Sequence, residues 1–148
     1  MDCLLVSAGS WTCALPLTCV AETMRALPTR PCASVAPYVR GVSLIRGRAT
    51  VVLDLAWLLG GVSGSCLRFV LLRTNDRPVV LGVDTLHGIR ALSEADLQPL
   101  RGVLTPFAHS QVRALQALDE GLVALLEPTI VLTQDLPCEP DREPVLAP

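Results

Sequence analysis

The sequence predicts an all-β protein made of small barrels, and three observations lead to this fold class. Apolar residues occur in short runs rich in Val, Leu and Ile, which is typical of buried strands. Glycines, prolines and an Asn-Asp pair separate these runs and supply turns. The order is strand, turn and strand without long crossover helices, which favours small barrels over a βαβ sheet.

Composition sets the scale of this fold. The 148 residues suffice for one domain of ordinary size, or for two very small lobes that share a core. Apolar residues make up 51% and charged residues 18%, as in a globular rather than a disordered chain. Aromatic residues are only 3%, so the core must be built from Leu, Val, Ala and Ile.

The expected strands follow one another along most of the chain. They span residues 3–9, 12–24, 41–48, 49–60, 66–74 and 78–92, with two more inside residues 111–132. The last residues, 135–148, are rich in proline and acidic side chains, so we expect a disordered tail there.

Proline and glycine define the connections in the first half. Pro16 has no N–H to donate, so it is expected at a sheet edge or a bulge. Three further prolines exclude a long helix from residues 28–41 and favour a loop with one short turn. Residues 60–64, Gly-Gly-Val-Ser-Gly, are expected to form a flexible connection.

Polar residues define the connections in the second half. Asn75 and Asp76 suit a tight turn that tolerates left-handed backbone. Ser93, followed by two acidic residues, predicts one short helical turn. Residues 119–121, Asp-Glu-Gly, predict a hairpin corner, so two strands are preferred to a helix in this part of the chain.

The corner Arg46-Gly47-Arg48 stands out because it interrupts a mostly apolar segment. Gly47 supplies the backbone freedom that a tight strand connection needs. A hairpin would hold Arg46 in a defined position, where its guanidinium can fork to a carboxylate or carbonyl of a partner, as interface arginines often do. The alternative is a solvated arginine at a turn, and these residues alone do not separate the two.

The sequence contains no recognised catalytic motif. The phosphate loop, the dinucleotide-binding glycines, H-E-x-x-H and G-x-S-x-G are all absent. His87 and His109 lie far apart in the sequence and are interpreted as structural or surface residues. Asp54 and Asp84 each end an apolar run; they are interpreted as turn caps, with a catalytic carboxylate pair or a reactive cysteine as the enzyme alternative.

Cysteine usage favours free thiols and gives no metal site. The six cysteines are at positions 3, 13, 19, 32, 66 and 138. No C-x-x-C pair occurs and no Cys/His cluster has zinc spacing, so no metal or cofactor is expected. Several cysteines lie in apolar runs, where they behave as small buried side chains. Three disulfides in a secreted domain remain the alternative.

Net charge and mean hydropathy indicate whether the chain binds nucleic acid or enters a membrane. A formal net charge of -2 argues against nucleic acid as the main ligand. A mean hydropathy of +0.49 raises the question of a membrane, and residues 3–21 carry no charge. Pro16, Gly9 and several hydroxyl residues interrupt that run, and a basic flank is missing, so two strands are preferred to a spanning helix or signal peptide. No direct membrane insertion is expected.

Residues 38–60, YVRGVSLIRGRATVVLDLAWLLG, resemble the signature of the chemotaxis coupling protein CheW family. In that family a G-V-x-N-L-R-G stretch precedes a strand that ends in D-L. The other segments that resemble the family, in the same order, are residues 3–28 with a V-x-E element at Val20 and Glu22, residues 77–100, and residues 112–128. The likeness covers roughly residues 3–132.

The resemblance implies a CheW-like domain over residues 1–134, with two intertwined, five-stranded SH3-like β-barrels, a groove between them and an approximate switch near residues 60–66. It implies a non-enzymatic, cytoplasmic adaptor that joins chemoreceptor cytoplasmic tips to the regulatory domain of a CheA-type histidine kinase. The kinase would pack against the end of the first barrel.

The resemblance also assigns residues to these contacts. The receptor-facing positions would be Val20, Glu22, Arg46 and Ile89, with Arg48 and Arg68 in possible support and Gly41 and Gly47 as structural turn residues.

Leu44-Ile45 stand where the family has Asn-Leu, and Arg68 stands where an apolar residue is usual. These departures leave open a divergent accessory protein that binds the receptor but not the kinase and tunes the array.

Overall fold

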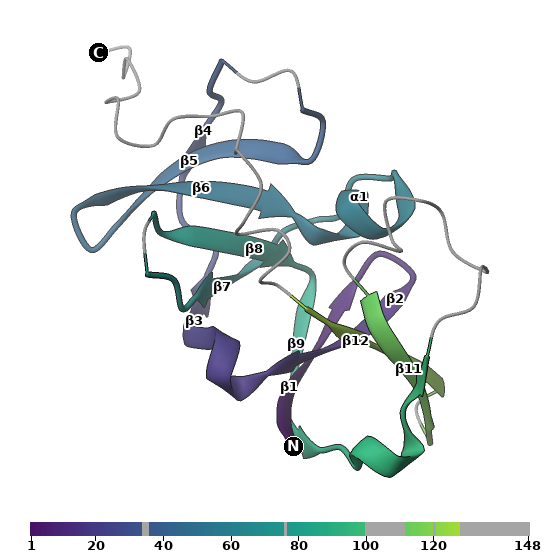
Figure 1. Cartoon of the computed structure of the whole chain (residues 1–148). Coiled ribbons are helices and arrows are strands. Elements are labelled where there is room, and N and C mark those ends of the chain that lie inside the picture. Colours follow the sequence, from purple (N-terminus) through teal and green to yellow (C-terminus); the bar gives the residue numbers. More distant parts are fainter. Residues whose placement is uncertain (34–35, 76, 100–111, 120, 128–148) are drawn as a thin grey trace.

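The computed structural model describes residues 1–33, 36–75, 77–99, 112–119 and 121–127, and within them the chain is almost entirely strands and turns (Figure 1). The elements are β1 (Asp2–Ala8), β2 (Trp11–Pro16), the 3-10 turn η1 (Leu17–Cys19), β3 (Val20–Arg25), β4 (Thr29–Arg30), β5 (Val39–Ile45), β6 (Arg48–Asp54), α1 (Leu55–Gly60), β7 (Arg68–Leu72), β8 (Val79–Val83), β9 (Thr85–Ala91), η2 (Glu94–Asp96), β10 (Gln98–Pro99), β11 (Val112–Leu118) and β12 (Gly121–Leu126). The all-β prediction is confirmed.

The strands form two sheets of six. The first has the order β10-β11-β12-β2-β1-β9, and the second has the order β3-β7-β8-β6-β5-β4. The chain passes from the first sheet to the second at η1 and returns at Asp84, between β8 and β9. Two curved sheets therefore replace the two five-stranded closed barrels that we expected, since the ladders among the described residues do not form rings.

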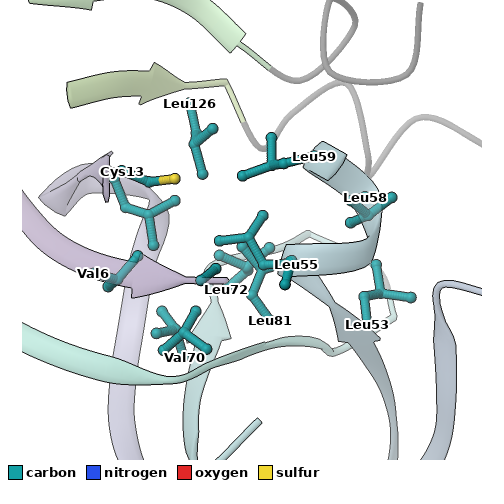
Figure 2. Close-up of a cluster of buried hydrophobic side chains, with 14 of the residues drawn as sticks. Val6, Cys13, Leu53, Leu55, Leu58, Leu59, Val70, Leu72, Leu81 and Leu126 are labelled. Carbon is teal, nitrogen blue, oxygen red and sulfur yellow. The ribbon is translucent and has the colours of Figure 1, made fainter. Parts of the chain in front are cut away.

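Apolar side chains pack in three clusters rather than one. The largest lies between the two sheets and includes Val6, Leu53 and Leu81. A second covers the other face of the first sheet, around Leu5 and Leu125, and a third covers the other face of the second sheet. Figure 2 shows side chains from β1, β2, β7, β8, β12 and α1 meeting in the largest cluster.

Burial on both faces explains why the strands read as continuous apolar runs. Along β1, Leu4 and Val6 enter the cluster between the sheets, whereas Cys3 and Leu5 enter the cluster on the opposite face. A sheet that buries both faces must either be covered or curl around its own side chains. Each sheet curls in this way, which preserves the barrel character of the prediction without ring closure.

Two long runs that we predicted as single strands are each divided between the sheets. Residues 12–24 break at η1, so β2 belongs to the first sheet and β3 to the second. Residues 78–92 break at Asp84, with β8 in the second sheet and β9 in the first. Alternation of apolar residues does not reveal such a break, because both sheets continue the same alternating burial.

Pro16 lies at the end of β2 rather than at a sheet edge or a bulge. The strand is interior to the first sheet, between β12 and β1. The pairing with β12 covers Thr12 to Ala14 only, so the missing N–H of Pro16 interrupts no ladder on that side.

The predicted strand over residues 49–60 is wrong in its second half. The strand β6 ends at Asp54, and residues 55–60 form the helix α1. The helix buries Leu55, Leu58 and Leu59 in the cluster between the sheets, so its apolar residues resemble those of a strand. Sequence periodicity cannot distinguish the two over so short a run.

Several connections match their predictions. The strands β5 and β6 form a hairpin, β7 and β8 are antiparallel neighbours, and β11 pairs with β12 from Leu118 and Gly121 onward. The predicted helical turn is η2, although Ser93 makes no side-chain cap there.

Residues 60–66, the expected switch between lobes, connect α1 to β7, and the strands on both sides belong to the second sheet.

The cysteines depart from prediction at one position. Cys3, Cys13, Cys19 and Cys66 are free thiols, as expected. The prediction of a free thiol is wrong for Cys32, which is disulfide-bonded.

Other predictions are not tested by the described residues. Within the part of the chain that the structure describes, no helix has the length and hydropathy to cross a membrane. His109, Cys138 and the tail 135–148 lie outside the described residues, so the predictions about them stay predictions.

Candidate protein-interaction surface

The Arg46-Gly47 corner is a two-residue hairpin turn. Ile45 and Arg48 are paired across the ladder, and the two residues between them have φ of +50° and +78°. Positive φ at both central positions matches the twist of the strands, as in a type I′ turn. Glycine adopts this conformation freely, whereas an arginine rarely does. The turn places Arg46 at the tip of the hairpin, with its side chain 74% exposed.

Arg46 makes a bidentate ion pair with Glu22. Nε donates to Oε2 at 2.9 Å and Nη2 donates to Oε1 at 2.7 Å. The hydrogen bond from Arg46 holds the pKa of the Glu22 carboxyl below its usual value, and the same bond raises the pKa of Arg46. Glu22 lies on β3, at one edge of the second sheet, so the pair joins this edge to the β5–β6 hairpin and supports the curl of the sheet.

The other predicted receptor-facing residues lie on two sheets. Val20 begins β3 and packs, half-buried, against the cluster between the sheets. Ile89 lies on β9, an edge strand of the first sheet, where it is 66% exposed opposite Leu4. Arg48 is exposed at the start of β6.

Arg68 was predicted as a supporting position, but its partner across the sheet and the exposure of Leu44 were not predicted. Arg68 is half-buried on β7, where it is directly opposite Arg25 on β3. Leu44, two residues before Arg46, is 67% exposed. Their signal in the sequence was weak, because the partner of a strand residue depends on register.

Gly41 lies inside β5, at a bulge, and not in a turn. Its φ is +143°, and the ladder with β6 shifts register between Val39 and Gly41. A Cβ built on Gly41 would lie 2.0 Å from the carbonyl oxygen of Arg30. Only glycine permits this approach of the two backbones. Gly47 differs, because a Cβ there would meet nothing within 4 Å.

Asp54 caps α1 from a fully buried position. Its Oδ1 accepts a hydrogen bond from the Trp57 amide at 3.3 Å, and its Oδ2 accepts one from the Gly64 amide at 3.1 Å. The Nε of Arg40 lies 4.0 Å from Oδ2. Arg40 also donates to the Gly64 carbonyl oxygen at 3.0 Å. The carboxylate therefore fixes both the start of the helix and the loop that follows it.

Asp84 joins three segments at the point where the chain changes sheets. Oδ2 accepts a hydrogen bond from the Gly9 amide at 2.8 Å, and Oδ1 accepts bonds from the Ser65 amide and hydroxyl, each at 2.9 Å. The Cys66 amide donates to Oδ1 at 3.4 Å. Burial acts to raise the pKa of Asp84, but these donors outweigh it and hold the pKa below its usual value.

These contacts favour the turn-capping interpretation of both aspartates over the catalytic one. An ionised carboxylate whose oxygens are occupied by amide donors is poorly suited to exchange protons with a substrate. A hollow of about 280 Å³ near Cys19 and Arg113 includes neither Asp54 nor Asp84. Burial raises the pKa of the Cys13 thiol to about 12 and that of Cys66 to about 11, opposite to the shift of a reactive cysteine.

His87 does not complete a catalytic site either. It is exposed on β9, and its Nε2 makes a hydrogen bond with the Ser7 hydroxyl on the neighbouring strand β1. Within the described residues, no group of three or more His, Cys, Asp or Glu side chains is placed to hold a metal ion.

The change Asp84→Asn is expected to lower the free energy of unfolding by about 1–3 kcal/mol at pH 7, because the amide NH₂ would face N–H donors. The pKa of Asp84 is lowered on folding, so its ionised form stabilises the protein above the unfolded pKa of about 4, and this contribution is lost as the pH falls through the folded pKa. The difference between variant and wild type should therefore shrink on acidification. Urea unfolding followed by the fluorescence of Trp11 and Trp57 measures both effects.

The control for this prediction is Asp96→Asn, since Asp96 is an exposed acid in η2. It should change the stability by less than about 0.5 kcal/mol. Equal losses in the two variants, or a difference that does not depend on pH, would show that the Asp84 contacts are unimportant.

Comparison with known proteins identifies similar sequences over most of the chain. A family model described as the CheW-like domain matches residues 2–135. The chemotaxis protein CheW of Rhizobium meliloti (strain 1021) is 28% identical over 103 residues, which are 68% of this chain and 66% of that protein, slightly less than two thirds of its length.

The fold is also that of a solved structure. The scaffolding protein TtCheW from Thermoanaerobacter tengcongensis matches with a TM-score of 0.74 at 16% identity, over 85% of this chain and 83% of that chain. At that identity the match shows the shared fold alone. Because the family model matches nearly the whole length, the chain belongs to the CheW-like domain family.

Proposed function

We propose that the protein is a non-enzymatic adaptor of a bacterial chemosensory array, working in the cytoplasm by protein–protein contacts alone. In this proposal it joins the cytoplasmic tips of chemoreceptors to a CheA-type histidine kinase. The observation that carries the proposal is the exposed Glu22–Arg46 pair, which a tight hairpin displays on a CheW-like fold.

The geometry of this pair suits recognition of a polar partner. A guanidinium has five N–H donors, and Arg46 uses two of them on Glu22. Three donors remain for a receptor carboxylate or carbonyl. The ion pair holds the guanidinium in one orientation before binding, which reduces the entropy lost when a partner docks. By the resemblance, Val20 on β3 and Ile89 on β9 would add apolar contacts to the same partner.

The receptor interaction can be tested by pull-down with purified chemoreceptor cytoplasmic fragments. Wild-type protein should be retained, and Arg46→Ala and Glu22→Ala should each reduce retention strongly. Arg30→Ala provides a matched control, because this arginine is exposed on β4, outside the proposed contact. Absence of binding by the wild type, with both variants silent, would count against the adaptor.

Kinase binding distinguishes the full coupler from the accessory alternative. In the full coupler, the kinase regulatory domain packs against the surface that the resemblance identifies as the end of the first barrel. The specific observation that favours the alternative is Leu44, an exposed apolar side chain where the family has a polar one. Co-sedimentation with receptor and kinase regulatory domain separates the two, because only the full coupler recruits the kinase.

A further inference from the structure

Two arginines face each other across neighbouring strands of the second sheet. Arg25 on β3 and Arg68 on β7 are direct partners in the antiparallel ladder. The preceding pair, Met24 and Phe69, packs in the third cluster, so alternation places both arginines on the opposite face, from which Val70 enters the cluster between the sheets. Arg25 is exposed and Arg68 is half-buried.

This pair costs stability in the free protein. Side chains directly opposite in an antiparallel ladder have Cβ atoms about 5 Å apart, and like charges at that separation repel. The ion pairs among the described residues are Arg40–Asp54 and Glu22–Arg46, and neither includes Arg25 or Arg68. No acidic neighbour within that part of the chain therefore compensates the repulsion.

An exposed leucine lies beside the two charges. Leu27 lies two residues after Arg25 and is 38% exposed. The Ala26 amide donates to the Leu67 carbonyl oxygen at 3.0 Å, which continues the contact between the two segments. The surface thus combines two unneutralised guanidinium groups with an exposed apolar side chain near Arg25, a pattern typical of a protein interface.

We propose that Arg25 and Arg68 together form a carboxylate-binding site that takes an Asp or Glu side chain of the partner protein. Two guanidinium forks can each donate to one carboxylate, and this carboxylate replaces the missing counter-charge. The exposed Leu27 beside Arg25 favours a protein segment over a phosphate backbone, as does the net charge of -2. The inference rests on the proposed function, because the partner is taken to be the chemoreceptor fragment.

The test uses Arg25→Gln, Arg68→Gln and the double variant, with Arg30→Gln as matched control. In urea unfolding at low salt, each single variant should raise the midpoint by about 0.2 M, and the double should gain no more. The gain should vanish in about 0.5 M NaCl, where the repulsion is screened. The control should show no gain. A merely structural role would lower the midpoint instead.

Binding supplies the second measurement. The affinity for a labelled chemoreceptor cytoplasmic fragment, followed by fluorescence anisotropy, should fall about five- to tenfold in each single variant. The control should stay within about twofold. Variants that are more stable than the wild type and bind more weakly would establish the site.

Other outcomes would overturn the inference, and they can be distinguished. If Arg46→Ala weakens fragment binding but the Arg25 and Arg68 variants do not, the carboxylate site is wrong and the proposed function stands. If the wild type does not bind the fragment, both fail. Binding to phosphatidylglycerol vesicles is measured in parallel. If the variants bind the fragment as well as the wild type does but lose binding to these vesicles, the pair recognises lipid phosphate instead. A lowered midpoint in the single variants would show that the arginines are structural.

Discussion

Gly41→Ala should destabilise the protein by about 3 kcal/mol or more, which is a large fraction of the free energy of unfolding of an ordinary domain. Two costs combine at this position. The φ of +143° is unfavourable for any residue with a side chain, and the new Cβ would lie 2.0 Å from the carbonyl oxygen of Arg30. Either β4 must move away from β5 or the bulge must be lost. Thermal unfolding should show a decrease of about 6–12 °C in Tm.

Gly47→Ala is the matched control for this prediction. Its φ is +78°, but a Cβ at this position would meet no other atom within 4 Å. The expected loss is the conformational cost alone, about 1 kcal/mol. Comparable losses in the two variants would show that the close approach of Arg30 to Gly41 does not constrain the strand.

Arg46→Glu should reduce the affinity for a chemoreceptor cytoplasmic fragment by about 30-fold or more, the effect of losing a central arginine anchor. The variant places a glutamate at the hairpin tip, next to Glu22 on β3. It therefore removes the guanidinium donors and adds repulsion toward any receptor carboxylate. Because the tip is exposed, loss of the ion pair should lower the urea midpoint only slightly. Surface plasmon resonance with immobilised fragment measures the loss.

The charge swap Glu22→Arg with Arg46→Glu separates recognition from structure. The swap restores an ion pair between β3 and the hairpin but reverses its direction. We expect folding to remain normal and binding to remain lost, because the receptor would meet a carboxylate where it needs a guanidinium. Recovery of binding in the swapped protein would show that the pair only supports the curl of the sheet.

Features with a strict local requirement could be predicted from the sequence. The Arg46-Gly47 turn follows from an Arg-Gly pair between two apolar runs, since few other connections fit there. Asp54 and Asp84 were interpreted as turn caps, and both accept backbone hydrogen bonds. The fold class followed from the length and punctuation of the apolar runs.

Features that depend on long-range packing could not be predicted. The division of the 12–24 and 78–92 runs between two sheets depends on which partner each half meets, and alternation is the same in both sheets. The helix α1 could not be distinguished from a strand, because all its apolar residues are buried. The opposition of Arg25 and Arg68 depends on the register of β3 and β7, which neither strand specifies alone.

The route of the chain between the sheets has a consequence for synthesis on the ribosome. All strands of the second sheet lie in one continuous stretch, β3 to β8, and can assemble as soon as that stretch has emerged. The strands β1 and β2 emerge before that stretch but must wait for β9 and β12, their neighbours in the first sheet. During that interval β1 and β2 present unpaired edges, so premature termination after β8 would release a product prone to aggregate.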